Sequence, residues 1–178
     1  MELPEFRYHP DPLASGSVVE SKQACRCCGM VRGYVYTGPV YAEEDLQDAL
    51  CPWCIADGSA HSKFGGTFVD SEAFTGVADN AVMTALVERT PGFSAWQSEQ
   101  WPCCCADATA FVTPAGIQEL RQQKELEGLA LSHIIYDIGV SGGAAKRLLE
   151  SLDRNAGPTA YVFQCLHCRR YLFHIDFA

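Results

Sequence analysis

The chain has 178 residues, of which 22 are Asp or Glu and 13 are Lys or Arg, so its formal net charge at pH 7 is -9. Proteins that bind nucleic acid by neutralising phosphates carry a surplus of Lys and Arg, so this composition argues against direct nucleic-acid binding. Hydrophobic residues make up 48% of the chain, which is enough to fill a core. No apolar run approaches the roughly 18 residues of a membrane span, and the first residues lack the pattern of a signal peptide. We therefore expect a cytoplasmic protein with no membrane contact.

The chain contains ten cysteines, an unusual number for the reducing cytosol, where disulfides are rare. Three pairs have the C-x-x-C spacing: Cys25/Cys28, Cys51/Cys54 and Cys165/Cys168. That spacing lets one tight turn direct two thiolates at a single ion, so metal binding is the leading interpretation.

The first two pairs predict one zinc site. Gly29 follows the first pair and can adopt the positive φ with which such a turn ends, and Pro52 restrains φ inside the second turn. The interval between the pairs matches common zinc modules in which two such turns hold one ion. The predicted ligands of this tetrahedral Zn²⁺ are Cys25, Cys28, Cys51 and Cys54, with Cys27 pointing away from the metal.

Two other interpretations of these thiols stay open. The segment from Cys51 to Cys54 has the form of a thioredoxin-type redox motif, which requires a hydrophobic strand before it and a helix after it. Residues 42–50 instead resemble a short acidic helix, so the context argues against a redox dithiol. The other alternative is that the thiols are inert and buried, since free cysteine is among the most buried residue types.

The third pair predicts the tip of a β-hairpin. Strand-like residues 161–163 precede Cys165 and Cys168, and apolar side chains alternate through 171–177 after them. A cysteine pair at such a tip is half of a zinc-ribbon site.

A second zinc ion at this hairpin needs two more ligands, and the remaining thiols are the run from Cys103 to Cys105. An extended chain would offer Cys103 with Cys105, whereas a turn would offer Cys104 with Cys105. The weaker candidates are Asp107, His167 and His174. A metal-free thiol cluster is the alternative. Three isolated histidines are expected to be structural rather than ligands: His9, His61 and His133.

The whole pattern predicts an α+β fold, with zinc-ribbon-like β-hairpins and cysteine knuckles flanked by about three helices. An aromatic strand is expected within 32–41. Helices are expected over 42–50, 79–89 and 114–131, and from Ser141 to before Gly157. Residues 1–75 would form a zinc-knuckle module with aromatic strands. Residues 76–178 would form a helical segment and the C-terminal hairpin, packed with the first module as one unit.

Several long stretches carry a resemblance to one bacterial family. They are Leu3–Leu13, Gly38–Tyr41, Cys51–Ala60, Arg89–Phe93 with Trp96-Gln97, and Cys165–Asp176. On these motifs, which span nearly the whole chain, the protein resembles the CbrC family. That family is associated with tolerance to a nuclease colicin, and its members resemble immunity proteins of toxin–immunity systems.

The resemblance also implies a ligand set for the second zinc ion. By position, Cys104 stands where the family usually has a histidine, and Cys105 is the shared thiol. The implied set is Cys104, Cys105, Cys165 and Cys168, with Cys103 as the alternative to Cys104. Cysteine is an acceptable replacement for histidine at zinc, so the site would become four thiolates.

Four thiolates around Zn²⁺ leave no open coordination position, and the sequence has no nucleophile elbow, phosphate loop or HExxH helix, so we expect no enzyme activity. The acidic charge and the resemblance together favour an immunity protein that neutralises a basic toxin domain, such as a nuclease, by direct binding. The expected contact residues are Tyr41, Glu43, Glu44, Asp45, Asp48, Asp57 and Trp53, with Tyr34 and Tyr36 as further anchors. The alternatives are a redox or metal-handling protein that uses the surplus thiols, and a zinc-ribbon adaptor.

Overall fold

The computed structural model describes residues 2–74, 79–97 and 99–177. Its N-terminal half carries β1 (Val18–Glu20), β2 (Tyr34–Tyr36), α1 (Pro52–Ala56), α2 (Ser59–Phe64) and α3 (Asn80–Arg89). Its C-terminal half carries β3 (Cys103–Cys104), β4 (Asp107–Ala108), β5 (Ala110–Ala115), α4 (Ile117–Gln122), α5 (Lys124–Tyr136), α6 (Gly142–Ser151), β6 (Thr159–Gln164) and β7 (Tyr171–Asp176). The predicted α+β class with hairpin-borne cysteine knuckles is confirmed, although the short helices α1 and α2 were not anticipated.

The N-terminal half packs around the antiparallel pair β1–β2, in which Val18 lies opposite Tyr36. Val18, Tyr36, Leu50 and Ile55 are buried there together with three of the cysteines. Most of this half is loop, so its core is small and includes sulfur atoms as packing groups. A core of this size depends on additional constraints for its stability.

The predicted helix over 42–50 is wrong, because this segment forms bends and turns. Leu46 and Leu50 are spaced as on a helix, and both are buried. The Leu50 carbonyl instead accepts a hydrogen bond from the Tyr36 N–H, and Asp48 has a φ of 53°. An isolated helix of this length is only marginally stable, so backbone pairing with β2 replaces it.

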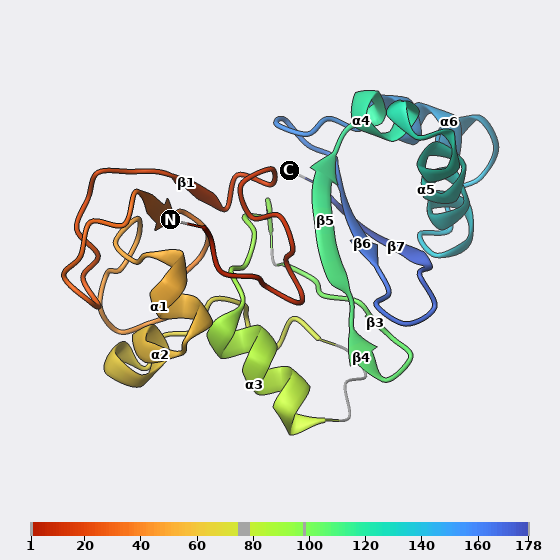
Figure 1. The fold of residues 1–178 in the computed structure, drawn as a ribbon. Coiled ribbons are helices and arrows are strands. Elements are labelled where there is room, and N and C mark those ends of the chain that lie inside the picture. The colour runs from red at the N-terminus through yellow and green to blue at the C-terminus, as the bar shows by residue number, and fades with distance from the viewer. Residues whose placement is uncertain (1, 75–78, 98, 178) are drawn as a thin grey trace.

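The C-terminal half is built on a three-stranded antiparallel sheet of order β5-β6-β7. Helices α4, α5 and α6 cover one face of this sheet, as Figure 1 shows. Val162 of β6 packs toward these helices, whereas Tyr161 and Phe163 pack into an aromatic core with Phe93 and Trp101. Strand β6 is therefore buried on both faces, which explains its unbroken apolar run.

Of the other three predicted helices, two are confirmed and the third is divided in two. Helix α3 begins after Asp79, whose carboxylate accepts a hydrogen bond from the Ala81 N–H at 2.7 Å. Helix α6 follows Ser141 and ends at Ser151, earlier than Gly157. The helix predicted over 114–131 is replaced by the end of β5 and by α4 and α5, which an extended Gln123 separates. Pro114 is tolerated in β5 because that strand lies at the edge of the sheet.

A third group of buried side chains joins segments that are distant in sequence. Tyr8, Val69 and Leu86 meet Trp101 and Phe111 there. The predicted boundary between residues 75 and 76 lies outside the described residues, so the two-module division stays a prediction. Within the described ranges, no helix is long and apolar enough to cross a bilayer.

Candidate metal centres

The structure gathers eight cysteines into two groups of four. The first cluster consists of Cys25, Cys28, Cys51 and Cys54, and the second cluster of Cys104, Cys105, Cys165 and Cys168. Within each cluster the four sulfur atoms lie within 4.8 Å of one another. All ten cysteines of the chain are free of disulfides.

A tight turn and a helix start position the sulfur atoms of the first cluster. The Gly29 N–H donates to the Cys25 carbonyl at 2.7 Å, the Cys25 N–H donates to the Met30 carbonyl at 2.9 Å, and Gly29 has a φ of 73°. Cys51 is the N-cap of α1, which carries Cys54 on its first turn. The Cys51 N–H donates to the Cys25 sulfur at 3.2 Å, so backbone groups already orient the thiols.

The sulfur separations of the first cluster fit a filled tetrahedron. The Sγ–Sγ distances are 3.9 Å for Cys25 and Cys54, 3.9 Å for Cys28 and Cys51, and 3.6 Å for Cys51 and Cys54. A Zn–S bond of about 2.3 Å places two sulfur atoms of a tetrahedral site about 3.8 Å apart. A disulfide would bring them to about 2.05 Å. The donor set therefore suits a zinc ion.

Electrostatics around the first cluster favour thiolate at Cys25 and the protonated thiol at Cys51 and Cys54. The hydrogen bond with Cys51 lowers the pKa of Cys25 to about 4, and it raises the pKa of Cys51. The Arg32 guanidinium lies 5.4 Å from the Trp53 ring centre. Burial opposes the charge of Arg32, but the neighbouring sulfur of Cys28 outweighs it and raises the pKa of this arginine. A cation beside four thiolates offsets part of their negative charge.

Two hairpin tips meet at the second cluster. Cys105 and Ala106 form the turn between β3 and β4 and have φ values of 54° and 58°, as in a type I′ turn. The other tip, between β6 and β7, repeats the turn of the first cluster: the Arg169 N–H donates to the Cys165 carbonyl at 3.1 Å, and the Cys165 N–H donates to the Arg170 carbonyl at 2.8 Å. Arg169 has a φ of 62°, the conformation that Gly29 has in the first cluster.

The hairpin geometry brings Cys104, not Cys103, to the second cluster. The Cys104 sulfur lies 3.8 Å from that of Cys105 and 3.6 Å from that of Cys168. The Cys103 sulfur instead lies 3.8 Å from the Trp101 carbonyl oxygen. Adjacent residues of a strand point to opposite faces, so the pairing of β3 with β4 turns Cys103 away.

The second cluster is more exposed than the first. Cys105 and Cys168 are exposed, whereas Cys165 is buried. Burial raises the pKa of Cys165, but hydrogen bonds from the backbone N–H groups of Cys168 and His167 outweigh it and lower this pKa to about 6. A surface cluster in which one thiol, Cys165, ionises readily can bind a metal ion and is open to competing ligands.

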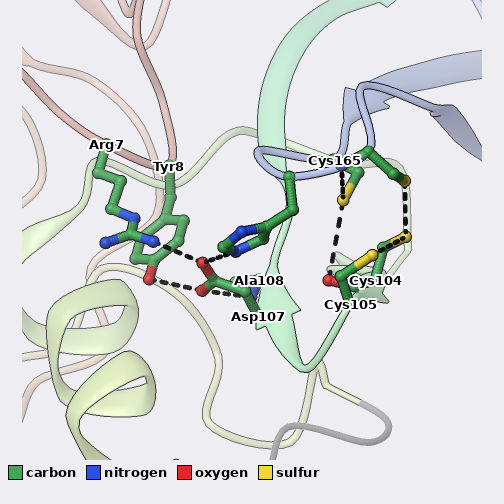
Figure 2. Close-up of polar contacts among 9 residues, drawn as sticks. Arg7, Tyr8, Cys104, Cys105, Asp107, Ala108 and Cys165 are labelled. Carbon is green, nitrogen blue, oxygen red and sulfur yellow. Dashed lines mark hydrogen bonds and ion pairs between the residues drawn. The ribbon is translucent and has the colours of Figure 1, made fainter.

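Asp107 joins the second cluster to the N-terminal segment, as Figure 2 shows. Its side chain is 7% exposed and accepts hydrogen bonds from Arg7 (2.6 Å), the Tyr8 hydroxyl (2.9 Å) and His167 Nε2 (2.8 Å). Burial raises the pKa of Asp107, but hydrogen bonds from His167 and Tyr8 and the charge of Arg7 outweigh it and lower this pKa. Asp107 therefore supports the turn from Cys165 to Cys168 through its hydrogen bond with His167. It is not one of the four ligands of the second cluster. No signal in the sequence pointed to this role.

Neither of the other weak candidates, His167 and His174, is among the gathered donors, and the three histidines expected to be structural also lie outside both clusters. His174 stacks near Tyr161, and His9 bonds the Pro91 carbonyl and the Ser15 hydroxyl at 2.7 Å each. His61 lies 3.5 Å from Glu88, and His133 lies 2.7 Å from Asp137. Cys27 is half-buried, and its sulfur is 3.6 Å from the Ser59 hydroxyl. A helix does follow Cys51, as a redox motif requires, but it has only five residues.

Comparison with known proteins assigns the chain to a family. Residues 3–177 match the uncharacterised protein family UPF0167. The chain belongs to the UPF0167 family. It is 45% identical to the UPF0167 protein Mb2317 of Mycobacterium bovis and to MT2352 of Mycobacterium tuberculosis, over 99% of this chain and 95% of each relative. It is 43% identical to the UPF0167 protein PA1536 of Pseudomonas aeruginosa, over 98% of this chain and 97% of the relative. No solved structure matches it.

In this UPF0167 protein the expected contact residues lie on the loop before α1, in α1 itself (Trp53) and directly after it (Asp57). The exposed members are Tyr41, Glu43, Glu44, Asp45, Asp48 and Asp57, and Trp53 is half-buried. Glu44 pairs with Arg26 at 2.8 Å. We name residues 43–48 the acidic segment; its role as a contact surface stays a prediction.

The expectation that Tyr36 anchors a partner is wrong. Its side chain is fully buried, its hydroxyl donates to the Pro39 carbonyl at 2.8 Å, and its ring packs edge-on against Phe68. Tyr34 is half-buried beside Trp53, with ring centres 6.3 Å apart. Alternation along β2 sends these two tyrosines to the same face, but the core covers only Tyr36.

Proposed function

We propose that this UPF0167 protein is a zinc-stabilised binding protein whose two cysteine clusters each hold one structural Zn²⁺. The observation that carries this proposal is the separation of the sulfur atoms, 3.6–3.9 Å, which suits four thiolates around one zinc. Four protein ligands complete a tetrahedral ion, so each zinc would stabilise the fold and would not activate water. The protein would therefore act through its surface and not as an enzyme.

The negative charge of this protein favours a cationic protein as its partner. Each zinc with four thiolates adds two negative charges, which takes the formal charge from -9 to about -13. Such a surface attracts cationic proteins at raised rates and keeps polyanions away. A nuclease domain is basic where it binds phosphates, so an acidic protein can cover its cleft and compete with nucleic acid.

We therefore propose a cytoplasmic immunity protein that neutralises a basic toxin domain, above all a nuclease, through the acidic segment. The resemblance to the CbrC family supports this function, and the exposure of the acidic segment makes it accessible. Tyr41 and Trp53 beside the segment would add aromatic contact area, which interfaces favour.

Metal content tests the structural part of the proposal. Elemental mass spectrometry of the protein purified without chelator should give two zinc ions per chain. A ratio of one would remove the second site, and a ratio near zero with intact folding would remove both.

Protection of DNA tests the binding part. The probe is the cytotoxic domain of a nuclease colicin, with any toxin-like protein encoded beside the gene as a second probe. The zinc-loaded protein should block DNA cleavage, and reversing Glu43, Glu44 and Asp48 to Lys should abolish that block.

The matched control reverses three exposed acids that lie elsewhere, Glu5, Glu20 and Glu125, and so changes the net charge equally. Equal protection by the two triple variants would rule out the acidic segment as the contact surface. Failure of the parent protein to protect against either probe would overturn the immunity function.

One observation favours a second function, metal handling at the second cluster. Cys105 and Cys168 are exposed, so a competing chelator or another protein can reach their sulfur atoms. Transfer of zinc from this cluster to an apo metalloprotein, faster than release into buffer alone, would support metal handling. A transfer rate equal to the spontaneous release rate would exclude it.

A further inference from the structure

Glu99 is a buried carboxylate with one unsatisfied oxygen. The residue is 3% exposed, and its Oε1 accepts hydrogen bonds from the Asp70 N–H (2.6 Å) and the Tyr41 hydroxyl (3.2 Å). Its Oε2 is buried, and no group in the described part of the chain bonds it. An unpartnered buried carboxylate oxygen is costly and calls for an explanation.

The groups that face Glu99 do not neutralise it. Burial raises its pKa to about 7, and the carboxylate of Asp70 adds to this effect, against the opposing hydrogen bonds from Asp70 N–H and Tyr41. The N–H of Phe93 is near enough to lower this pKa, and the buried hydroxyl of Tyr36 is close by. Among the described residues these neighbours are acidic, aromatic or uncharged, and none of them is a cation that could pair with an ionised Glu99.

A cavity of about 210 Å³ leads to this carboxyl group. Its lining is polar at Thr37, Gln47 and Gln97 and aromatic at Tyr41 and Phe93, and among the described lining residues none is Lys or Arg. A water molecule occupies about 30 Å³ of liquid, so the cavity has room for an ammonium or guanidinium group with part of its alkyl chain.

The cavity borders the surface that we propose as the contact site. Gln47 lies in the acidic segment between Asp45 and Asp48, which are both exposed. Tyr41 is 43% exposed, and its long hydroxyl contact with Glu99 is the weaker of the two bonds to Oε1. A long cationic side chain that entered here would pass acidic groups, meet the tyrosine ring and reach the buried carboxylate.

We infer that this cavity receives the cationic end of a lysine or arginine side chain of a basic protein partner, which pairs with Glu99. The inference rests on the proposed function, because it names the group that such a partner inserts. A buried ion pair at the centre of an interface, ringed by polar residues, is the arrangement of a binding hot spot. The acidic segment would guide the partner, and Glu99 would select a side chain with a positive end.

The first test uses the zinc-loaded full chain and three small probes, followed by ¹⁵N NMR. The probes are the N-acetyl methylamides of lysine, arginine and norleucine, which differ in charge at similar length. The two cationic probes should shift the amide signals of Tyr41, Ser94 and Gln97, and norleucine should not. Glu99→Gln keeps an acceptor for the Asp70 N–H and should weaken cation binding by at least about tenfold.

Glu125→Gln is the matched control, because it removes an exposed carboxylate of α5, outside the acidic segment, and leaves the cavity intact. It should retain cation binding at the cavity. Equal binding by Glu99→Gln, equal shifts with norleucine, or no shifts with either cationic probe would overturn the inference.

The second test separates this inference from the proposed function. If the nuclease domain binds Glu99→Gln as tightly as the parent while the Lys variant of the acidic segment fails, the function stands and the cavity is not used. If the cationic probes bind at Glu99 but no toxin domain is neutralised, the cavity is a cation site and the immunity function is wrong.

Discussion

The two cysteine clusters share one turn and differ in their surroundings. In both, the N–H of the first cysteine donates to the carbonyl five residues on, and its carbonyl accepts from the N–H four residues on. Gly29 and Arg169 occupy the same left-handed position. The first cluster, however, is part of the N-terminal core, whereas the second lies at two hairpin tips with two exposed sulfurs.

Because of this difference, we expect the same set of four cysteines to have a different effect on stability in each cluster. Three sulfurs of the first cluster pack with Val18, Tyr36 and Leu50, so removing a metal there would also disrupt the small core. The second cluster adjoins a sheet that has its own helical cover, and Asp107 ties it to Tyr8 and His167. We therefore expect the first zinc to be required for folding and the second to be locally stabilising and more labile.

Cysteine substitutions should show the largest contrast. Cys51→Ser should lower the free energy of unfolding by more than about 4 kcal/mol or prevent folding, because metal and core are lost together. Cys168→Ser should cost about 1–3 kcal/mol and leave a folded protein with one zinc. Urea unfolding and elemental analysis of both variants measure this contrast. Equal losses of stability would show that the two clusters form one cooperative unit.

The pH dependence of stability should separate Glu99 from both clusters. Burial raises the pKa of Glu99 from 4.5 to about 7, so the folded protein holds this proton more tightly than the unfolded chain. The stability from this group is therefore fully present below pH 4.5 and is lost as the pH rises to 7. The total is about 3 kcal/mol.

Glu99→Gln cannot titrate, so relative to the parent it should gain about 3 kcal/mol between pH 4.5 and pH 7. Zinc clusters weaken as the pH falls in both proteins, because thiolates take up protons, and this effect cancels in the difference. Urea unfolding across this window measures the gain. A constant difference would mean that Glu99 ionises normally in the folded protein.

Asp107→Asn should weaken the second cluster without touching its sulfurs. The new amide N–H₂ would face the donors of Arg7 or His167, so a buried hydrogen bond would be replaced by a repulsive contact costing about 2–3 kcal/mol. Zinc release to a chromogenic chelator should become faster for one of the two ions. Glu72→Gln, at an exposed carboxylate, serves as the control and should leave the release rate unchanged.

The shared turn predicts the smallest effects, with opposite signs. Arg169→Gly should stabilise the protein by about 1 kcal/mol, since glycine adopts a φ of 62° without strain. Gly29→Ala should destabilise it by about 1 kcal/mol, because an added Cβ there meets no atom within 4 Å and only the backbone conformation is strained. Thermal unfolding of the zinc-loaded variants measures both. Changes of the same sign would contradict the equivalence of the two turns.

The local parts of this architecture could be predicted from the sequence, and the long-range parts could not. Hydrogen bonds within a C-x-x-C turn span at most five residues. The turns that begin at Cys25 and Cys165, and the hairpins that carry them, could therefore be predicted from the local sequence. The helix predicted over residues 42–50 is wrong because Leu46 and Leu50 have helical spacing, whereas the backbone of Leu50 pairs with β2. Cys104, and not Cys103, joins the second cluster because Cys105 adopts a left-handed conformation in the turn. Cysteine is not a residue type that predicts this conformation.

By itself the sequence determined that this protein has cysteine knuckles at metal spacing, an acidic charge and an alternating C-terminal hairpin. Only the tertiary structure decided which cluster is buried, that Asp107 links Tyr8 to His167, and that one buried oxygen of Glu99, beside a cavity, has no hydrogen-bond partner among the described residues. The physical reason is range: turn geometry and net charge follow from neighbouring residues and composition. Burial and pairing instead depend on segments brought together from distant parts of the chain.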